Sequence, residues 1–105
     1  MLEVLDRIKQ KSTSAGLGNF VLGDVVEGFR PFSEFGTTEF YYCIQCHSMG
    51  EWEIGRGKLS GSELERLEIL SSSNNNEKVN FSTDDEKLVF NTLPMVPLVE
   101  NFGET

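Results

Sequence analysis

The sequence is poor in the residues that most often build metal, redox or disulfide sites. Its 105 residues include 2 cysteines and 1 histidine. Two cysteines do not make a disulfide framework, and we expect them to be reduced thiols. A structural zinc ion ordinarily takes four protein ligands, so zinc would need ligands from a second subunit. We therefore expect neither a metal nor a cofactor.

Positive charge and long apolar runs are scarce as well. The chain has 9 Lys and Arg residues against 17 Asp and Glu residues, which gives a formal net charge of −8. A negative chain is repelled by nucleic-acid phosphates. No run approaches the roughly 18 apolar residues of a membrane-spanning helix, and charged residues interrupt the N-terminus where a signal peptide would be apolar. We predict synthesis in the cytoplasm without export, and no binding to nucleic acid or membranes.

A catalytic constellation is missing too. The chain has 1 histidine and no serine in a G-x-S-x-G turn. Asp84 and Asp85 lack the loop spacing of an EF-hand calcium site. The sequence thus predicts a protein that is not an enzyme. Carbohydrate binding through Tyr41 and Trp52 is a further hypothesis, which depends only on these rings being exposed.

Short runs separated by turn-forming residues fill the sequence. Gly, Ser, Thr and Asn divide it into runs of about 5 to 9 residues, a length typical of strands. The clearest strand is 40–46, in which Phe40, Tyr42 and Ile44 share one face. We predict an all-β fold, a small antiparallel sandwich or barrel-like domain over residues 1–93 with extended N- and C-terminal arms.

Other segments carry weaker patterns. Residues 51–54 alternate with period two before Gly55 and Gly57 break the pattern. Residues 78–81 and 87–90 alternate on either side of a polar turn, which predicts a terminal hairpin. Ser62-Glu63-Leu64-Glu65 has the form of a helix capping box, so residue periodicity leaves the segment up to Leu70 open between helix and strand.

Three phenylalanines, Phe29, Phe32 and Phe35, recur at intervals of three. They suit an aromatic contact patch for a partner. The competing interpretation, which we favour, is a short turn or distorted helix that packs these rings on the sheet.

The most conspicuous motif is Cys43-Ile44-Gln45-Cys46-His47, which has the form of a c-type haem attachment site. In a strand, residues three apart point to opposite faces, so the two thiols could not hold one haem. Met49 is too close to His47 to ligate the far side of a haem. We favour a buried thiol and a turn histidine. A haem or redox protein using Cys43, Cys46 and His47 stays as the alternative from another class.

An ordered series of motifs resembles the small β-module at the N-termini of tail-fibre and other virion structural proteins of tailed bacteriophages. The similarity covers roughly residues 2–93 and depends on the order of the motifs rather than on any one of them. The motifs include Asp6-Arg7-Ile8-Lys9, Phe20-Val21-Leu22-Gly23, Gly28-Phe29-Arg30-Pro31-Phe32-Ser33, Tyr41-Tyr42-Cys43-Ile44, Trp52-Glu53-Ile54-Gly55-Arg56-Gly57 and Val79-Asn80-Phe81-Ser82.

This resemblance implies a virion structural protein, and it favours a strand over residues 63–70. Its partners would be other virion proteins, and a homo-oligomer is implied, most simply a trimer. Tail-fibre or baseplate attachment is the first expectation, and a capsid decoration (cement) protein is the second. Residues 94–105, which contain two prolines, would be an extended arm laid on a neighbouring subunit. Its apolar contact residues would be Met95, Val96, Leu98, Val99 and Phe102.

Overall fold

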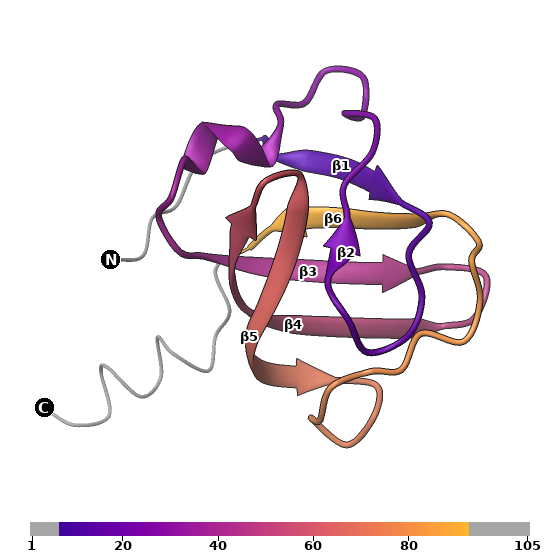
Figure 1. Cartoon of the computed structure of the whole chain (residues 1–105). Helices are drawn as coiled ribbons and strands as arrows, with labels where there is room; N and C mark the ends of the chain where they lie inside the picture. The colour runs from indigo at the N-terminus through magenta and orange to yellow at the C-terminus, as the bar shows by residue number, and fades with distance from the viewer. Residues whose placement is uncertain (1–6, 93–105) are drawn as a thin grey trace, which may run out of the picture.

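The structure, a computed structural model, describes residues 7–92. This part of the chain is all-β and contains no α-helix, as the sequence predicts (Figure 1). The strands are β1 (Lys9–Ser12), β2 (Phe20–Val21), β3 (Phe40–Cys46), β4 (Glu51–Ser60), β5 (Glu63–Ser72) and β6 (Lys87–Asn91). One short 3-10 helix, Phe32–Phe35, precedes β3. The expected arm at 94–105 lies outside the described residues.

The six strands form one antiparallel sheet in the order β1-β6-β3-β4-β5-β2. The sheet curls into a nearly closed barrel. Closure comes from the chain after β2, which runs back along β1. The Gly23 amide donates to the Lys11 carbonyl at 2.7 Å, and the Lys11 amide donates to the Asp24 carbonyl at 2.9 Å. Because these bonds join β1 to the chain that follows β2, the outer edge of β1 is paired rather than open.

The core is aromatic, and alternation along β3 builds its centre. Phe40, Tyr42 and Ile44 are all fully buried, as the sequence predicts. The 3-10 helix Phe32–Phe35 covers one end of the barrel. Its Phe35 ring stacks on Phe40 at 4.5 Å between centroids, and its Phe32 ring lies 4.9 Å from Phe40. Burial of these large rings gives a small domain much of its apolar area.

Two sequence expectations about β4 and β5 have different outcomes. Residues 63–72 form a strand rather than a helix, because the segment pairs with both β4 and β2. The break expected at Gly55 and Gly57 is wrong, since β4 continues through both glycines to Ser60.

The predicted terminal hairpin is also wrong. β6 pairs with β1 and β3 and not with residues 78–81. Within the described chain, those residues contribute a single isolated bridge, between Phe81 and Gly16. Val79 and Phe81 are buried as their alternation suggests, but the backbone of Val79 is bound by side chains instead of a strand, as shown below.

Candidate functional site

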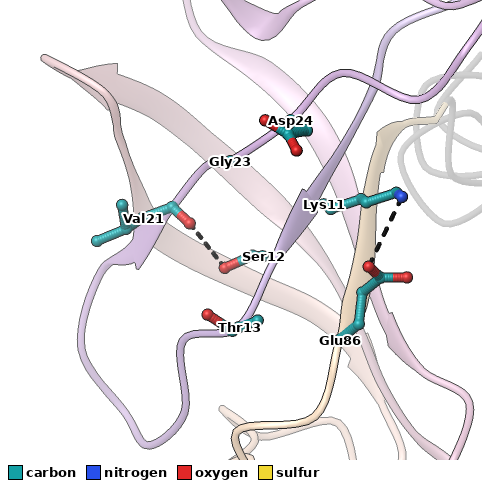
Figure 2. A pocket seen from close by; sticks show the side chains of 7 residues that line it. All are labelled: Lys11, Ser12, Thr13, Val21, Gly23, Asp24 and Glu86. Carbon is teal, nitrogen blue, oxygen red and sulfur yellow. Dashed lines mark hydrogen bonds and ion pairs between the residues drawn. The ribbon is translucent and has the colours of Figure 1, made fainter.

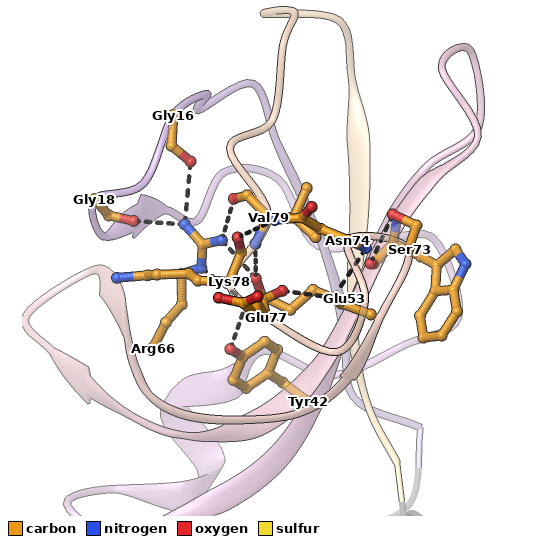
Figure 3. A network of polar contacts seen from close by, with 12 residues as sticks. Gly16, Gly18, Tyr42, Glu53, Arg66, Ser73, Asn74, Glu77, Lys78 and Val79 are labelled. Carbon is orange, nitrogen blue, oxygen red and sulfur yellow. Dashed lines mark hydrogen bonds and ion pairs between the residues drawn. The ribbon is translucent and has the colours of Figure 1, made fainter.

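A buried ion pair occupies the inside of the barrel. Glu53 of β4 and Arg66 of β5 point inward, and both side chains have no exposed surface. The guanidinium makes two parallel contacts with the carboxylate, Nη2 to Oε1 at 2.6 Å and Nε to Oε2 at 2.8 Å (Figure 3). Bidentate pairing of this kind is the strongest form of a buried ion pair.

Both charged groups have all their hydrogen-bonding capacity filled. Besides its two bonds to Glu53, Arg66 donates from Nη1 to the carbonyls of Gly16 and Gly18, and from Nη2 to the carbonyl of Val79. Glu53 also accepts from the Tyr42 hydroxyl at 2.6 Å and from the Val79 amide at 2.8 Å (Figure 3). A guanidinium has five N–H donors and a carboxylate about four acceptor positions. The network is therefore saturated and leaves no group free to act on a substrate.

The two glycines of β4 make room for Tyr42. A Cβ atom at Gly55 would lie 2.7 Å from the Tyr42 hydroxyl oxygen, and one at Gly57 would lie 3.2 Å from the Tyr42 ring. Gly55 stands directly opposite Tyr42 in the β3–β4 register. Because glycine has no side chain, the ring can lie across β4 and bring its hydroxyl to Glu53.

The network perturbs the titration of its members. Burial raises the pKa of Glu53, but the hydrogen bonds from Arg66, Tyr42 and Val79 outweigh it and hold that pKa below its ordinary value. Burial, together with the neighbouring Glu53 charge, raises the pKa of Tyr42 well above its ordinary range. Glu53 is thus a carboxylate and Tyr42 a neutral donor throughout the physiological pH range.

Arg66 also joins segments far apart in the sequence. Its guanidinium lies 5.0 Å from the Phe20 ring centroid and 5.5 Å from the Phe81 ring centroid, which are cation–π distances. Together with its bonds to Gly16, Gly18 and Val79, these contacts fasten two long loops to the sheet. The contacts of Arg66 therefore stabilise the inside of the barrel.

A second buried cation stabilises the loop before β6. Lys87 is fully buried, and its ammonium donates to the carbonyls of Thr83 at 2.6 Å and Asp85 at 2.8 Å. Asp85 in turn accepts a hydrogen bond from Ser48 at 2.9 Å. The ammonium therefore organises the polar turn that the sequence predicts at 82–85.

A shallow cavity of about 300 Å³ lies at the seam where the barrel closes (Figure 2). Its polar groups bind one another: Lys11 forms an ion pair with Glu86 at 3.7 Å, and the Ser12 hydroxyl donates to the Val21 carbonyl at 2.8 Å. The lining residues are Lys11, Ser12, Thr13, Val21, Gly23, Asp24 and Glu86. The residues that line this cavity include no activated nucleophile and no convergent set of metal ligands.

The cysteine motif does not converge on a ligand. Cys46 is fully buried on the core side of β3, Cys43 is half-buried on the outer side, and His47 is exposed in the following turn. The two thiols thus lie on opposite faces of one strand, as its alternation predicts. Burial and the Glu53 charge raise the pKa of the Cys43 thiol to about 11, so it is a poor nucleophile. Within residues 7–92, no three metal-ligating side chains gather at one point.

The structure separates the three phenylalanines expected to form a contact patch. Phe32 and Phe35 are buried in the core, so their rings are unavailable to a partner. This corrects the patch hypothesis and agrees with the competing interpretation, because the 3-10 helix turns both rings onto the sheet. Phe29 is half-buried at the surface, with Arg7 and Lys9 over its ring at 4.3 and 4.5 Å. Met95, Val96, Leu98, Val99 and Phe102 lie outside the described residues.

The outward side of β6, β3 and β4 carries six apolar side chains around the exposed Gln45, and we name this set the outer apolar face. Cross-strand register places Phe90, Cys43 and Ile54 in one row, and Leu88, Gln45 and Trp52 in the next. Each of its apolar members is half-buried and keeps part of its surface exposed. They are Tyr41, Cys43, Trp52, Ile54, Leu88 and Phe90.

Charged residues border this face on both sides. Lys9 and Lys11 of β1 stand opposite Phe90 and Leu88 in the register. On the other side, Arg56 binds Glu39 at 2.6 Å and Glu68 at 3.2 Å. A partly apolar centre with a charged rim has the anatomy of a protein–protein interface.

Sequence reasoning missed Glu53 and Arg66, the two charged residues of the buried network. It placed Glu53 on the polar side of β4, with Trp52 and Ile54 as the apolar side, whereas Glu53 points inward. The available signal was that Gly55 and Gly57 fall on the same alternation as Glu53. Two glycines on one strand face indicate that another group approaches closely there.

Comparison with known proteins provides no relative. No protein-family model matches the chain, and neither a curated protein nor a solved structure is detectably similar to it. No helix within residues 7–92 is long and apolar enough to cross a membrane. Residues 7–92 thus form an all-β, nearly closed barrel with an aromatic core, one saturated buried ion-pair network and a partly apolar outer face.

Proposed function

We propose that this protein is a non-enzymatic structural component of a tailed-bacteriophage virion, a module that binds other particle proteins. The leading location is the attachment of a tail fibre or the baseplate. The observation that carries the proposal is the outer apolar face with its charged rim, because burial of such a surface is what an assembly module contributes.

The inside of the barrel supports a role without chemistry. Arg66 and Glu53 are fully paired, and Tyr42 is held as a neutral donor. The described residues offer shallow cavities and a thiol whose pKa is raised. An interior whose charged groups are all paired suits a rigid scaffold better than an enzyme that turns over a substrate.

The motif order described in the sequence supports the virion assignment, and it also suggests a trimer. A symmetric homo-oligomer would match the symmetry of a fibre, and other virion proteins would be its partners. A capsid decoration protein is the second candidate, because a small acidic β-domain with a partly exposed apolar face suits that place equally.

The haem alternative receives no support from the geometry. Both thiols would have to reach the same porphyrin, yet Cys43 and Cys46 lie on opposite faces of β3.

The experiment is detection of the chain in purified particles, followed by its localisation. Particles purified from infected cells should contain it in a fixed number of copies, and a labelled antibody should mark one end of the tail. Label on the head would select the decoration role instead. The chain's absence from purified particles, together with its presence in the infected cell, would overturn the virion proposal.

A further inference from the structure

Residues 13–22, which include β2, form a compact loop that leaves the barrel after β1 and returns beside it. We name this segment the flap. Its two ends are joined at a base outside the flap, because the Gly23 amide donates to the Lys11 carbonyl at 2.7 Å and the Lys11 amide donates to the Asp24 carbonyl at 2.9 Å. A compact surface loop with joined ends has the form of an Ω-loop. Such a loop can lift from the barrel while its base stays in place.

Backbone contacts between the flap and the rest of the described chain are few. β2 pairs with β5 over only two residues. The Gly16 amide donates to the Phe81 carbonyl at 2.9 Å, and the Leu22 amide donates to the Ser62 carbonyl at 3.0 Å. Most residues of the flap are exposed. Segments with few backbone bonds and much exposed surface open at a lower free energy than core strands do.

One aromatic ring and one guanidinium hold the flap against the barrel. The Phe20 ring is fully buried and lies edge-on to Phe81 at 5.2 Å between centroids. The Arg66 guanidinium lies 5.0 Å from the same Phe20 ring and donates to the carbonyls of Gly16 and Gly18 at 3.2 and 3.1 Å (Figure 3). Because Arg66 belongs to the buried ion pair, the closed flap forms part of the cover of that pair.

Two serine hydroxyls hold the flap at Val21. The Ser12 hydroxyl donates to the Val21 carbonyl at 2.8 Å, and the Val21 amide donates to the Ser14 hydroxyl at 2.9 Å. Side chains, rather than a further strand, thus bind both backbone groups of Val21. The shallow cavity at the seam, lined in part by Thr13 and Gly23, leaves space beside this contact (Figure 2).

We infer that the flap opens as one unit while the rest of the barrel stays folded. Opening removes Phe20 from the core and frees the Arg66 donors that bind the flap. The base stays closed, because the hydrogen bonds of Lys11 with Gly23 and Asp24 lie outside the flap. This inference goes beyond the proposed function and does not depend on it, since every contact involved lies within one molecule.

Amide hydrogen exchange of the full-length protein, resolved by residue with NMR, tests the flap. The amides of Gly16 and Leu22 donate to carbonyls of the barrel from two ends of the flap, so both report its opening. They should share one opening equilibrium, about 100-fold or more above that of the β3 and β4 amides. The base amides of Lys11 and Gly23 should be more protected than these two. Unrelated equilibria at Gly16 and Leu22, or exchange of both together with the core, would overturn the inference.

A disulfide between β2 and β5 should prevent the opening. Val21 and Glu63 stand directly opposite each other in the register. Because serine hydroxyls bind the backbone groups of Val21, this is a non-hydrogen-bonded pair, in which Cα atoms lie about 4.5 Å apart and cysteines can be bridged. In oxidised Val21→Cys with Glu63→Cys, the Gly16 and Leu22 amides should exchange about tenfold or more slowly than in the reduced form. Equal exchange in the two forms would contradict a flap that opens as a unit.

A serine substitution should have the opposite effect. Ser12→Ala removes a bond to Val21 and should speed exchange at Gly16 and Leu22 by about tenfold. Ser73→Ala is the matched control, because the Ser73 hydroxyl likewise binds both backbone groups of one residue, Trp52, at 3.1 and 3.3 Å, outside the flap. It should leave the two reporter amides unchanged. An equal effect of both substitutions would assign the exchange to global unfolding and remove the flap.

Discussion

Tyr42 and Glu53 are diagonal neighbours across β3 and β4, and the tyrosine hydroxyl donates a 2.6 Å hydrogen bond to the glutamate inside the barrel. The contact requires glycine at position 55, because a Cβ atom there would collide with the Tyr42 ring, which lies over β4. Arg66 then completes the charge balance. Stability should therefore respond strongly to small changes at these positions.

Removing the charge of Glu53 should be costly. Glu53→Gln leaves the Arg66 guanidinium buried without its counter-charge, and breaking a buried pair on one side costs about 3 to 5 kcal/mol. Urea unfolding of both proteins measures this change in the free energy of unfolding. The matched control is Glu34→Gln, which removes the exposed pair with Arg30 and should cost about 1 kcal/mol or less. Equal losses in the two variants would contradict a special role for the buried pair.

Stability should fall at both ends of the pH scale. The pKa of Glu53 is lowered in the folded state, so below its ordinary value of 4.5 the unfolded chain binds the proton first and the free energy of unfolding decreases. The pKa of Tyr42 is raised in the folded state, so above its ordinary value of 10.0 the unfolded chain loses the proton first and stability decreases again.

Thermal unfolding measured from pH 3 to 11, in steps of about one unit, should show constant stability near neutral pH and a decrease at both ends. Tyr42→Phe should remove the contribution of Tyr42 to the alkaline loss of stability. It should weaken the acid loss without abolishing it, because the hydrogen bonds from Arg66 and Val79 still lower the pKa of Glu53. The pKa of the Cys43 thiol is also raised, so this thiol should cause part of the alkaline loss of stability that remains in Tyr42→Phe. A wild-type protein equally stable at pH 3 and pH 7 would count against the Glu53 assignment.

A methyl group at Gly55 should disrupt the barrel. In Gly55→Ala the new Cβ would meet the Glu68 carbonyl oxygen and lie 2.7 Å from the Tyr42 hydroxyl oxygen. Neither atom can move away without breaking its strand or the network, so we expect a loss of about 3 kcal/mol or more in the free energy of unfolding. Gly18→Ala is the control, because a Cβ there meets nothing within 4 Å. It should be neutral or stabilise by about 0.5 kcal/mol.

The two thiols should be unreactive in the folded protein. Cys46 is buried, and the Cys43 thiol has a pKa of about 11, so a thiol reagent at pH 7.5 should modify neither rapidly. Denatured protein should show two reactive thiols, which provides the control. Co-expression with a haem-attachment system should give no covalent Soret band. A covalent band would restore the haem alternative.

The sequence predicts the fold correctly where polar and apolar side chains alternate along a strand. Phe40, Tyr42 and Ile44 lie on the core face of β3 as predicted. Period-two reasoning was wrong on β4, because it assumes that charge points outward. Glu53 is charged and points inward, and its pairing with Arg66, 13 residues further on, offsets the cost of burying that charge.

The terminal hairpin was wrong for a related reason. Residues 78–81 have the alternation of a strand, yet the Val79 amide donates to Glu53 and its carbonyl accepts from Arg66. The backbone groups that would have joined a strand ladder are used by two side chains instead. Local patterns do not report such long-range partners. The apolar rows of the outer face, by contrast, follow from strand register, which appears only once β6 is known to pair with β3.

The reach of Arg66 has a consequence for the order in which the barrel folds. Its partners Gly16 and Gly18 are 50 and 48 residues away in sequence, so the ion pair cannot be enclosed until the loop that holds these glycines has folded back onto β5. Contacts this distant slow folding, because loop closure must precede their benefit. The pair should form after the rate-limiting step, so substitutions at Arg66 should mainly speed unfolding and leave the folding rate nearly unchanged.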